Sequence, residues 1–433
     1  MKRKKYSLLS LLLLCSTMAF SQNPITGYAG VSDPHIRVFN DTVFLYSGHD
    51  TDPHDKTWVM KDWRVFSTTD LMHWKLRTTI RPEDNYMGTN TDCWATDAAT
   101  KNGKYYFYFS DEKRSVGVMV SNSPAGPFKD ALGKPLIAPM NDPTAFIDDD
   151  QAKTPYLIYG NKEMGGGYHI AKLNNDMISL AETPKLIVIN GKEWERTPQF
   201  MDKNYLFKYK DTYYISWGRG YATSKNIYGP YESVGRFGEG QGLNTLAHSS
   251  FFWWKGQFYQ VWCRYLDMAY KFRETIITFC HMNEKGEAIT DINFLDQHFS
   301  NGVGQYNASW PKIEAEWYSG ISGDIHKKGN LKDGIVLADI KNANWIRFAN
   351  VTFDKELKKL VVKELFSGKN GLVEIRTDSP KGNLLGTVKL TPAEGFQEVS
   401  CQLKGFVGKK DVFLVFKGTE ESTLQLDWFK FEE

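Results

Sequence analysis

One pattern returns five times along this chain: polar residues, an apolar strand, a polar turn and an aromatic strand. The copies begin near Ser32, Cys93, Asn141, Met201 and Ala247, at intervals of about 50 to 60 residues. Repeats on this scale are typical of propellers, solenoids or arrays. Each copy contains two β-rich runs around a turn signal, which is the pattern of a β-hairpin. A solenoid of helices is therefore excluded.

The segment after the hairpin also repeats. Two stretches, from Val116 and from Gly220, share a strand, a polar turn and a Gly-Pro-aromatic sequence. They predict a third and a fourth strand per copy. Four-stranded sheets arranged radially around a channel bury both of their faces against neighbours. The chain from about residue 27 to about residue 295 is therefore predicted to be an all-β, five-bladed β-propeller.

The innermost strand of each predicted blade starts with polar residues. These starts are Asp33, Trp94 with Asp97, Asp142, Asp202 and His248. All five strands would start at the same end of one axis. Acids that are scattered over more than 200 residues of sequence are thus expected to meet in one funnel.

The N-terminus predicts a signal peptide over residues 1–21. Four basic residues, Lys2 to Lys5, precede an apolar stretch from Leu8 to Leu14 and a cleavage site at Ala19-Phe20-Ser21. The apolar stretch is far shorter than the roughly 20 residues that a spanning helix needs. A lipid anchor on Cys15 is less favoured, because the small residue expected before it is missing. We expect a periplasmic or secreted protein with no membrane span.

Removal of that peptide would change the formal net charge from +2 (53 basic and 51 acidic residues) to −2 (49 and 51). A nucleic-acid partner is not expected, because such binding depends on excess positive charge. The remaining cysteines show no metal-ligand spacing. Cys263 and Cys280 lie on runs that could be neighbouring strands, so either a disulfide or two buried thiols is compatible with the sequence.

Three short motifs resemble glycoside hydrolase family 43. They are Asp33-Pro34-His35, Trp94-Ala95-Thr96-Asp97, and Asp142-Pro143-Thr144 followed by Phe-Ile-Asp-Asp-Asp. Members of that family are five-bladed propellers that cleave arabinofuranosidic, xylosidic and some galactosidic linkages with inversion. The resemblance covers about 270 residues. It implies an exo-acting enzyme with a polysaccharide or oligosaccharide substrate.

The resemblance also implies roles for the acids. An inverting glycosidase uses one carboxylate to deprotonate water and a carboxylic acid, on the other side of the sugar, to protonate the leaving oxygen. Asp33 would be the general base. Asp142 would orient the general acid and raise its pKa. An ordinary Asp-Pro turn at a strand start is the alternative for both residues.

The general acid is where the sequence departs from the family. The usual Glu-Gly-Pro is replaced by Asp202-Lys203-Asn204, so Asp202 stands where a glutamate is expected. Glu195 is the competing acid on the preceding loop, and a pair with Arg196 would explain it equally well. We favour Asp202 and leave Glu195 open.

Three further residues are candidates for substrate binding. Family members often carry a histidine near the channel axis, sometimes connected through water to a calcium ion, and His248 matches it. A second ion in the propeller channel is therefore possible, and a hydrogen-bonded core histidine is the alternative. Trp94 could form an apolar wall for a sugar. Arg219 could reach a hydroxyl or a carboxylate.

A second domain is predicted from about residue 308 to residue 433. Alternating strands are expected near residues 345–348, 360–362, 371–375 and 412–416. Short strands at this spacing predict a β-sandwich of jelly-roll type.

This domain resembles a family 6 carbohydrate-binding module, on the basis of its Ile-Glu-Ala-Glu opening and its Leu-Asp-Trp-Phe closing. The resemblance implies a structural calcium ion held by Glu314, Glu316 and Asp427. Phe396 and Gln425 occupy the positions where related modules carry a sugar-stacking aromatic and an asparagine. Sugar binding and a purely buttressing role both remain open.

We therefore expect an exported, inverting glycoside hydrolase that removes arabinofuranosyl, xylosyl or galactosyl units and acts as a monomer. Two alternatives remain. A catalytically inactive sugar-binding propeller is favoured by the missing Glu-Gly-Pro. A fructan-type propeller hydrolase is disfavoured, because its early Asn-Asp-Pro and its Arg-Asp-Pro are not found in that order.

Overall fold

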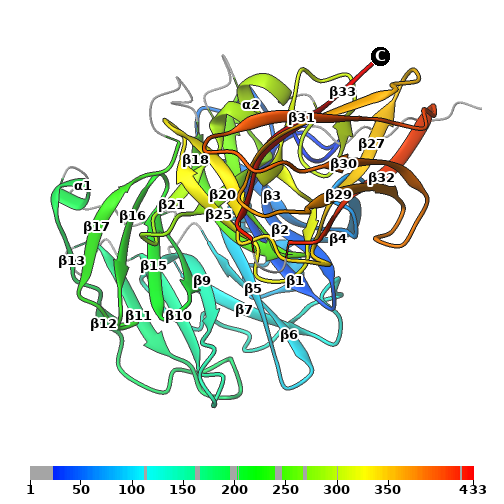
Figure 1. The fold of residues 1–433 in the computed structure, drawn as a ribbon. Helices are drawn as coiled ribbons and strands as arrows, with labels where there is room; N and C mark the ends of the chain where they lie inside the picture. The colour runs from blue at the N-terminus through cyan, green and yellow to red at the C-terminus, as the bar shows by residue number, and fades with distance from the viewer. Residues whose placement is uncertain are drawn as a thin grey trace, which may run out of the picture.

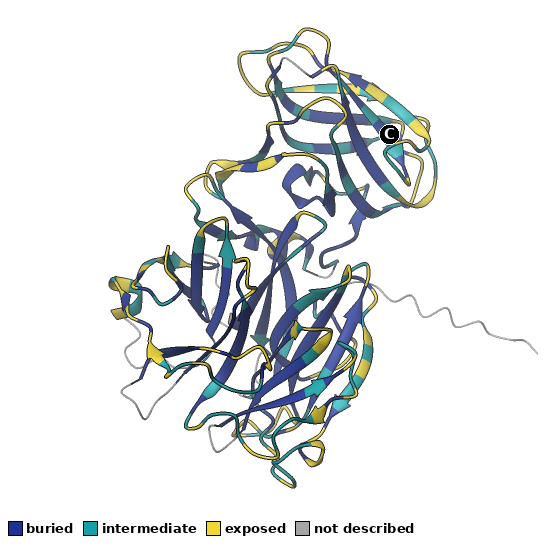
Figure 2. Cartoon of the chain, turned by 90° about the horizontal axis from the view of Figure 1, so that it is seen from below, coloured by how far each residue is buried: buried dark blue, intermediate teal, exposed yellow. Residues whose placement is uncertain are grey.

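The protein folds into two β-rich bodies (Figure 1), which are joined end to end in the view of Figure 2. The computed structural model describes residues 23–111, 115–160, 166–195, 202, 204–238, 246–266, 271–299, 301–419 and 422–433. The predicted signal peptide lies outside these ranges. The architecture is a five-bladed β-propeller followed by a β-sandwich, as predicted.

Five sheets form the propeller, and each starts with its innermost strand. The first blade contains β1 (Val31–Phe39), β2 (Thr42–Asp50), β3 (Met60–Thr68) and β4 (Lys75–Ile80). The second contains β5 (Thr96–Lys101), β6 (Lys104–Ser110), β7 (Val116–Ser121) and β8 (Lys129–Asp130). The third contains β9 (Asn141–Ile147), β10 (Pro155–Gly160), β11 (Tyr168–Lys172) and β12 (Lys185–Leu186). The fourth contains β14 (Asn204–Tyr209), β15 (Thr212–Trp217), β16 (Gly220–Ser224), β17 (Tyr231–Arg236) and the short β13 (Ile189–Asn190). The fifth contains β18 (Leu246–Trp254), β19 (Gln257–Tyr265), β20 (Arg273–Met282) and β21 (Ala288–Thr290).

Tight turns join the first two strands of the first, second and fifth blades. Both central residues have positive φ in each turn: Asn40 and Asp41 (49° and 60°), Asn102 and Gly103 (55° and 72°), Lys255 and Gly256 (52° and 81°). Two-residue turns with this backbone match the twist of paired strands, and Asn, Asp and Gly adopt it most readily. These predicted turns are therefore confirmed.

The ring closes where the first blade meets the last. The inner strands β1, β5, β9, β14 and β18 are neighbours in that order, and β18 also contacts β1. The segment before β1 pairs with the fifth blade. Ile25 N donates to Thr275 O at 2.9 Å, and the Asn23 side chain bonds both N and O of Ile277. Hydrogen bonds thus join the two ends of the propeller.

The sandwich has two six-stranded sheets. One contains β22 (Tyr306–Asn307), β24 (Gly320–Ile321), β27 (Trp345–Phe353), β29 (Leu372–Thr377), β30 (Leu384–Lys389) and β32 (Gly408–Lys417). The other contains β23 (Ile313–Glu314), β25 (His326–Asn330), β26 (Gly334–Ala338), β28 (Lys359–Phe366), β31 (Gln397–Gln402) and β33 (Leu424–Glu432). Buried and partly exposed side chains alternate along β29 and along most of β33, as expected for strands with one face on a core. The four strands predicted from the sequence correspond to β27, β28, β29 and β32, and β29 begins one residue later than predicted.

The sandwich packs tightly on the fifth blade. Gln257 Nε2 donates to the carbonyl oxygens of Glu316 and Tyr318, both at 2.8 Å. Trp317 Nε1 donates to Asp291 Oδ2 at 2.6 Å. At Gly256, a Cβ atom would lie 2.3 Å from Ile321 Cγ2, so only glycine fits this contact. The sandwich therefore packs directly against the fifth blade.

Short helices occur mainly in the connections. They are η1 (Pro82–Asp84), α1 (Lys192–Glu195), α2 (Ile292–His298) and η2 (Ala315–Trp317). No helix within the described ranges is long and apolar enough to cross a membrane. Among the same residues, Cys93, Cys263, Cys280 and Cys401 are free thiols. Cys263 on β19 stands opposite Thr275 on β20, and Cys280 lies five residues further along β20. The two cysteines are therefore too far apart for a disulfide.

Candidate active site

Asp33 lies at a distortion of the innermost strand of the first blade. The register of β1 against β2 shifts between Ser32 and His35, and Asp33 has a φ of 46°. Asp142 repeats this arrangement on β9, with a φ of 51° and a register shift at the same level. Positive φ is rare outside glycine, and bulges of this kind re-aim side chains next to active sites. Both acids are therefore set off the regular strand direction at one end of the channel.

A buried arginine holds Asp33. Arg273 NH2 lies 3.0 Å from Asp33 Oδ2, and NH1 donates to Oδ1 at 2.5 Å. The same guanidinium binds Asp50 through Nε (2.9 Å) and NH2 (2.8 Å). All three side chains are less than 10% exposed. Planar guanidinium groups bind carboxylates in this two-pronged way, so the orientation of Asp33 is fixed on the side that faces Arg273.

Histidines connect Asp33 to a second buried acid deeper in the channel. His248 Nδ1 lies 3.2 Å from Asp33 Oδ1, and its Nε2 lies 3.0 Å from Nε2 of His35. His35 Nδ1 lies 3.3 Å from Asp97 Oδ1. Arg37 completes the series with its guanidinium on both oxygens of Asp97. Asp33, His248 and Asp97 thus meet on the axis, as the sequence predicted.

Both axial acids are held in the ionised form. Burial alone would raise the pKa of Asp33, but the positive charge of Arg273 and the contact with His248 outweigh it and hold this pKa well below its usual range. Burial likewise opposes ionisation of Asp97, and Arg37 with His35 lowers its pKa to about 2. Asp33 is therefore a carboxylate at any pH at which the protein would work.

Asp142 and Asp202 lie on the other side of the channel, near Tyr168. The Tyr168 hydroxyl donates to the carbonyl of Asp202 at 2.7 Å. Burial raises the pKa of Tyr168 well above its usual value, and the charges of Asp202 and Asp142 raise it further. Asn204 Nδ2 donates to the carbonyl of Asp142 at 2.5 Å. The third and fourth blades thus bring these two carboxyl groups into one region.

The remaining candidates differ in their surroundings. Trp94 is half-buried, and its indole Nε1 is buried with no hydrogen-bond partner among the described residues. Arg219 donates to the backbone carbonyls of Phe237 and Gly238, which ties it to the end of β17. Glu195 is exposed at the end of α1, and its proposed partner Arg196 lies outside the described residues.

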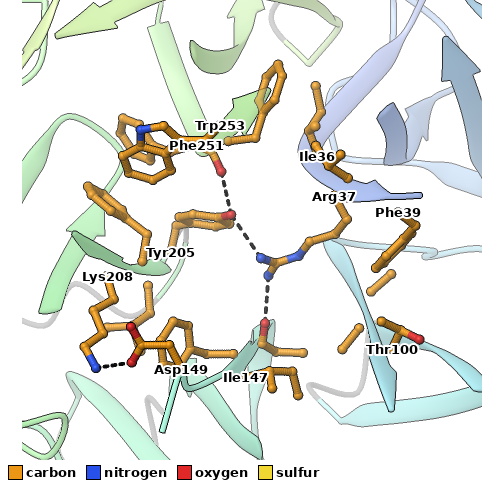
Figure 3. A pocket seen from close by; sticks show the side chains of 18 residues that line it. Ile36, Arg37, Phe39, Thr100, Ile147, Asp149, Tyr205, Lys208, Phe251 and Trp253 are labelled. Atoms are coloured by element: carbon orange, nitrogen blue, oxygen red, sulfur yellow. Dashed lines mark hydrogen bonds and ion pairs between the residues drawn. The ribbon is translucent and has the colours of Figure 1, made fainter. Parts of the chain in front are cut away.

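A cavity of about 460 Å³ lies at the opposite end of the channel (Figure 3). The later halves of the inner strands line it, with aromatic side chains such as Phe39 and Trp253. Arg37 donates there to the Tyr205 hydroxyl at 3.1 Å and to the Ala145 carbonyl. Asp149 is the carboxylate in the lining, and it pairs with Lys208. This cavity lacks the carboxyl pair that hydrolysis needs, so the candidate site is the end that holds Asp33.

The residues expected to hold calcium in the sandwich line one pocket of about 360 Å³ beside α2. Glu316 is 5% exposed, and its Oε2 has no partner among the described residues, which fits a cation. Glu314 and Asp427 are instead paired with Lys312 and Lys363. No three metal-binding side chains converge in the described part of the chain. Both lysines would have to turn away for a complete calcium site.

An ion on the propeller axis does not fit these residues. Asp97 is the acid that could hold it, and the Arg37 guanidinium already donates to both of its oxygens. The two ring nitrogens of His248 face other side chains, with Nδ1 3.2 Å from Asp33 Oδ1 and Nε2 3.0 Å from His35 Nε2. The Arg37 guanidinium thus supplies the positive charge beside Asp97, where an axial ion would otherwise bind.

Comparison with known proteins agrees with this geometry. The profile of glycosyl hydrolases family 43 matches residues 21–288, and that of carbohydrate-binding module family 6 matches residues 313–433. The chain belongs to glycosyl hydrolase family 43. It is 26% identical to an arabinoxylan arabinofuranohydrolase of Bacillus subtilis over 95% of this chain and 93% of that one. It is 29% identical to a β-D-galactofuranosidase of Aspergillus niger over 60% of this chain and 81% of that one.

Solved structures show the same architecture for this glycoside hydrolase. A family 43 arabinoxylan arabinofuranohydrolase from Bacillus subtilis, in complex with cellotetraose, covers 96% of this chain and 98% of its own at a TM-score of 0.54 and 23% identity. The second structure is a β-xylosidase/α-arabinofuranosidase from a compost metagenome, in complex with xylotriose and in a calcium-free form. The match covers 62% of this chain and 96% of that one, with a TM-score of 0.54 and 26% sequence identity.

The sequence did not reveal Arg273, Asp50, His35 or Arg37 as parts of the site. His35 was visible within the Asp-Pro-His motif, but a single histidine carries little information. Arg273 lies 240 residues from Asp33 in the chain. Arg273 begins β20, the third strand of the fifth blade, and this position at a strand start is the signal that could have found it.

Proposed function

We propose that this glycoside hydrolase is an exported, inverting enzyme that removes α-L-arabinofuranosyl side chains from a xylan-type polysaccharide. The supporting observation is the division of the site into an ionised carboxylate, Asp33, on one side and the pair Asp142 and Asp202 on the other. The relatives that span both domains are arabinoxylan arabinofuranohydrolases, which favours arabinofuranose over xylose or galactofuranose.

Asp33 would take a proton from the attacking water. Arg273 and His248 keep it ionised and fixed, and a preorganised base needs no reorientation during the reaction. Asp142 would orient the acid group, which lies on the same side of the channel. Asp202 is our choice for that acid, because its backbone is anchored by Tyr168 beside Asp142.

Hydrolysis of a panel of nitrophenyl glycosides and of arabinoxylan tests the substrate. We expect release of arabinose from the α-L-arabinofuranoside and from the polysaccharide, with weaker action on β-D-xyloside. Proton NMR during the first turnovers should show the inverted anomer. Retention of configuration would contradict the assignment of a base and an acid on opposite sides.

A pair of variants tests the acid. Loss of a general acid affects poor leaving groups most, since a nitrophenolate departs without a proton and a sugar alkoxide does not. Asp202→Ala should therefore abolish release from oligosaccharides and spare nitrophenyl glycosides, whereas Glu195→Ala should behave like the wild type. The reverse result would move the acid to Glu195.

The leader predicted over residues 1–21 supports the proposal of export. Expression of the full chain with cell fractionation would test it. Processing near residue 22 and recovery outside the cytoplasm are the expected outcomes, and an unprocessed cytoplasmic product would contradict them.

A further inference from the structure

Trp58 is an exposed tryptophan beside the charged cluster that holds Asp33. It lies on the connection between β2 and β3, at the end of the first blade where β1 begins. Its side chain is 37% exposed. The centre of its ring is 6.0 Å from Cζ of Arg273, the residue that binds Asp33 through two nitrogens.

A lysine fixes this ring. Nζ of Lys271 lies 3.0 Å from the centre of the Trp58 indole, a cation–π contact that favours one orientation of the ring. A lone exposed aromatic residue is common on protein surfaces and needs no explanation. Trp58 differs from that case, because a cation holds its ring and the ring lies beside Arg273, the arginine that binds the proposed base, Asp33. Sugar sites combine such preset apolar faces with a few polar groups.

The position of Trp58 also indicates which part of the substrate it meets. Trp58 and Arg273 belong to the first and fifth blades, and Asp142 and Asp202 belong to the third and fourth. In an inverting glycosidase the leaving group departs on the side of the acid, while the base and its water stand on the far side of the released sugar. Trp58 therefore stands on the side of the released sugar.

We propose that the Trp58 indole, held by Lys271, packs against the sugar that is released and selects its ring form, and does not contact the polysaccharide backbone. This inference rests on the proposed function. A pentofuranose presents a smaller apolar face than a hexose or a pyranose, so the distance of one fixed ring from Asp33 would discriminate among them.

Kinetics on two substrates with the same released sugar test this role. Trp58→Ala should lower kcat/KM by roughly ten- to a hundred-fold, the effect of losing one buried aromatic contact, and by the same factor on nitrophenyl arabinofuranoside and on arabinoxylan. The ratio of arabinofuranoside to xyloside cleavage should change as well. Trp58→Phe should recover part of the loss. If Trp58→Ala lowers the melting temperature, Trp58→Phe and Lys271→Met replace it in the same comparison.

Tyr228→Ala is the matched control, since Tyr228 lies 4.0 Å below Lys185 Nζ on the outside of the third and fourth blades. Tyr228→Ala should leave kcat/KM on both substrates unchanged, and also the ratio of arabinofuranoside to xyloside cleavage. A loss restricted to arabinoxylan would place Trp58 on the backbone and overturn the inference, as would an unchanged kcat/KM. A wild-type protein that hydrolyses no glycoside would instead contradict the proposed function before any variant is compared.

Discussion

Asp33 on the propeller axis and Glu316 next to the sandwich are almost equally buried, at 6% and 5% exposure, yet their surroundings are opposite. Arg273 binds both oxygens of Asp33, and its charge lowers the pKa. Glu316 has no salt bridge among the described residues. Burial, and then repulsion by Glu314 and Asp291, raise its pKa well above the usual value.

The same contrast separates Asp97 from Glu364, which are both fully buried. Asp97 has Arg37, whereas Glu364 has one hydrogen bond from Gln397, and burial raises its pKa to about 7. The difference teaches where charge is needed. The axis keeps carboxylates ionised by enclosing cations with them, as the proposed role of Asp33 as base requires, while the sandwich keeps its buried acids neutral or leaves them for an ion.

The two kinds of acid have opposite effects on the pH dependence of stability. A depressed pKa, as for Asp33 and Asp97, contributes stability above the unfolded value of about 3.8, and this contribution is lost as the pH falls through the folded pKa. A raised pKa, as for Glu364, contributes stability below the unfolded value and loses it as the pH rises. The propeller axis should therefore lose stability in acid, below about pH 3.8, and the sandwich should lose stability as the pH rises toward neutral.

The largest effect is expected when the axis loses its cation. Arg273→Met leaves Asp33 and Asp50 buried and uncompensated, which costs on the order of 3 to 5 kcal/mol of unfolding free energy. The pKa of Asp33 would also rise, so the acid limb of the kcat/KM profile should move to higher pH. Urea unfolding and a pH profile measure both.

Arg264→Met is the control for that variant, since Arg264 pairs with Glu274 at 3.4 Å on the same blade but is partly exposed. It should cost no more than about 1 kcal/mol. Equal destabilisation by the two variants would show that the buried pairing of Arg273 stabilises the fold no more than a partly exposed salt bridge does. The contrast between the axis and the sandwich would then lose its energetic basis.

The sequence predicted the fold well because the fold repeats. Five copies of one pattern and turn residues such as Asn102-Gly103 carry information locally, and each copy supports the others. The site could be predicted only in part. Asp33, Asp142 and His248 follow from motifs, but the partners that set their chemistry come from other blades, as Arg273 does.

The pKa of Glu364 was equally hidden from sequence. Strict alternation along β28 would treat this residue like any other strand position. A register shift between Lys363 and Glu364 interrupts the pairing with β33 at this point. Such irregularities depend on the partner strand and leave no local signature.

A smaller effect is expected when an ion reaches Glu316. Calcium that binds only the folded state at a hundredfold excess over its Kd adds about 2.7 kcal/mol. Differential scanning of the full chain with calcium and with chelator should show this as a shift of the transition that belongs to the sandwich. Glu316→Gln should abolish the shift, whereas Glu398→Gln, an exposed change on β31, should keep it. An identical shift in the wild type and in Glu316→Gln would remove Glu316 from the account of calcium binding.

The smallest effect concerns Glu364. Its pKa rises from an ordinary value of 4.5 to about 7 in the folded chain, because burial penalises the charged form. Its contribution is fully present below pH 4.5, and roughly 2 kcal/mol of it is lost by pH 6. Glutamine has nearly the same shape and no charge, so Glu364→Gln should match the wild type at pH 4.5 and exceed it increasingly up to pH 7. Melting temperatures across this range measure the divergence, with Glu398→Gln as the neutral reference. Parallel curves for Glu364→Gln and the wild type would show that Glu364 ionises as freely as a surface residue. Glu316 would then be the remaining example of a neutral buried acid in the sandwich to set against the ionised acids of the axis.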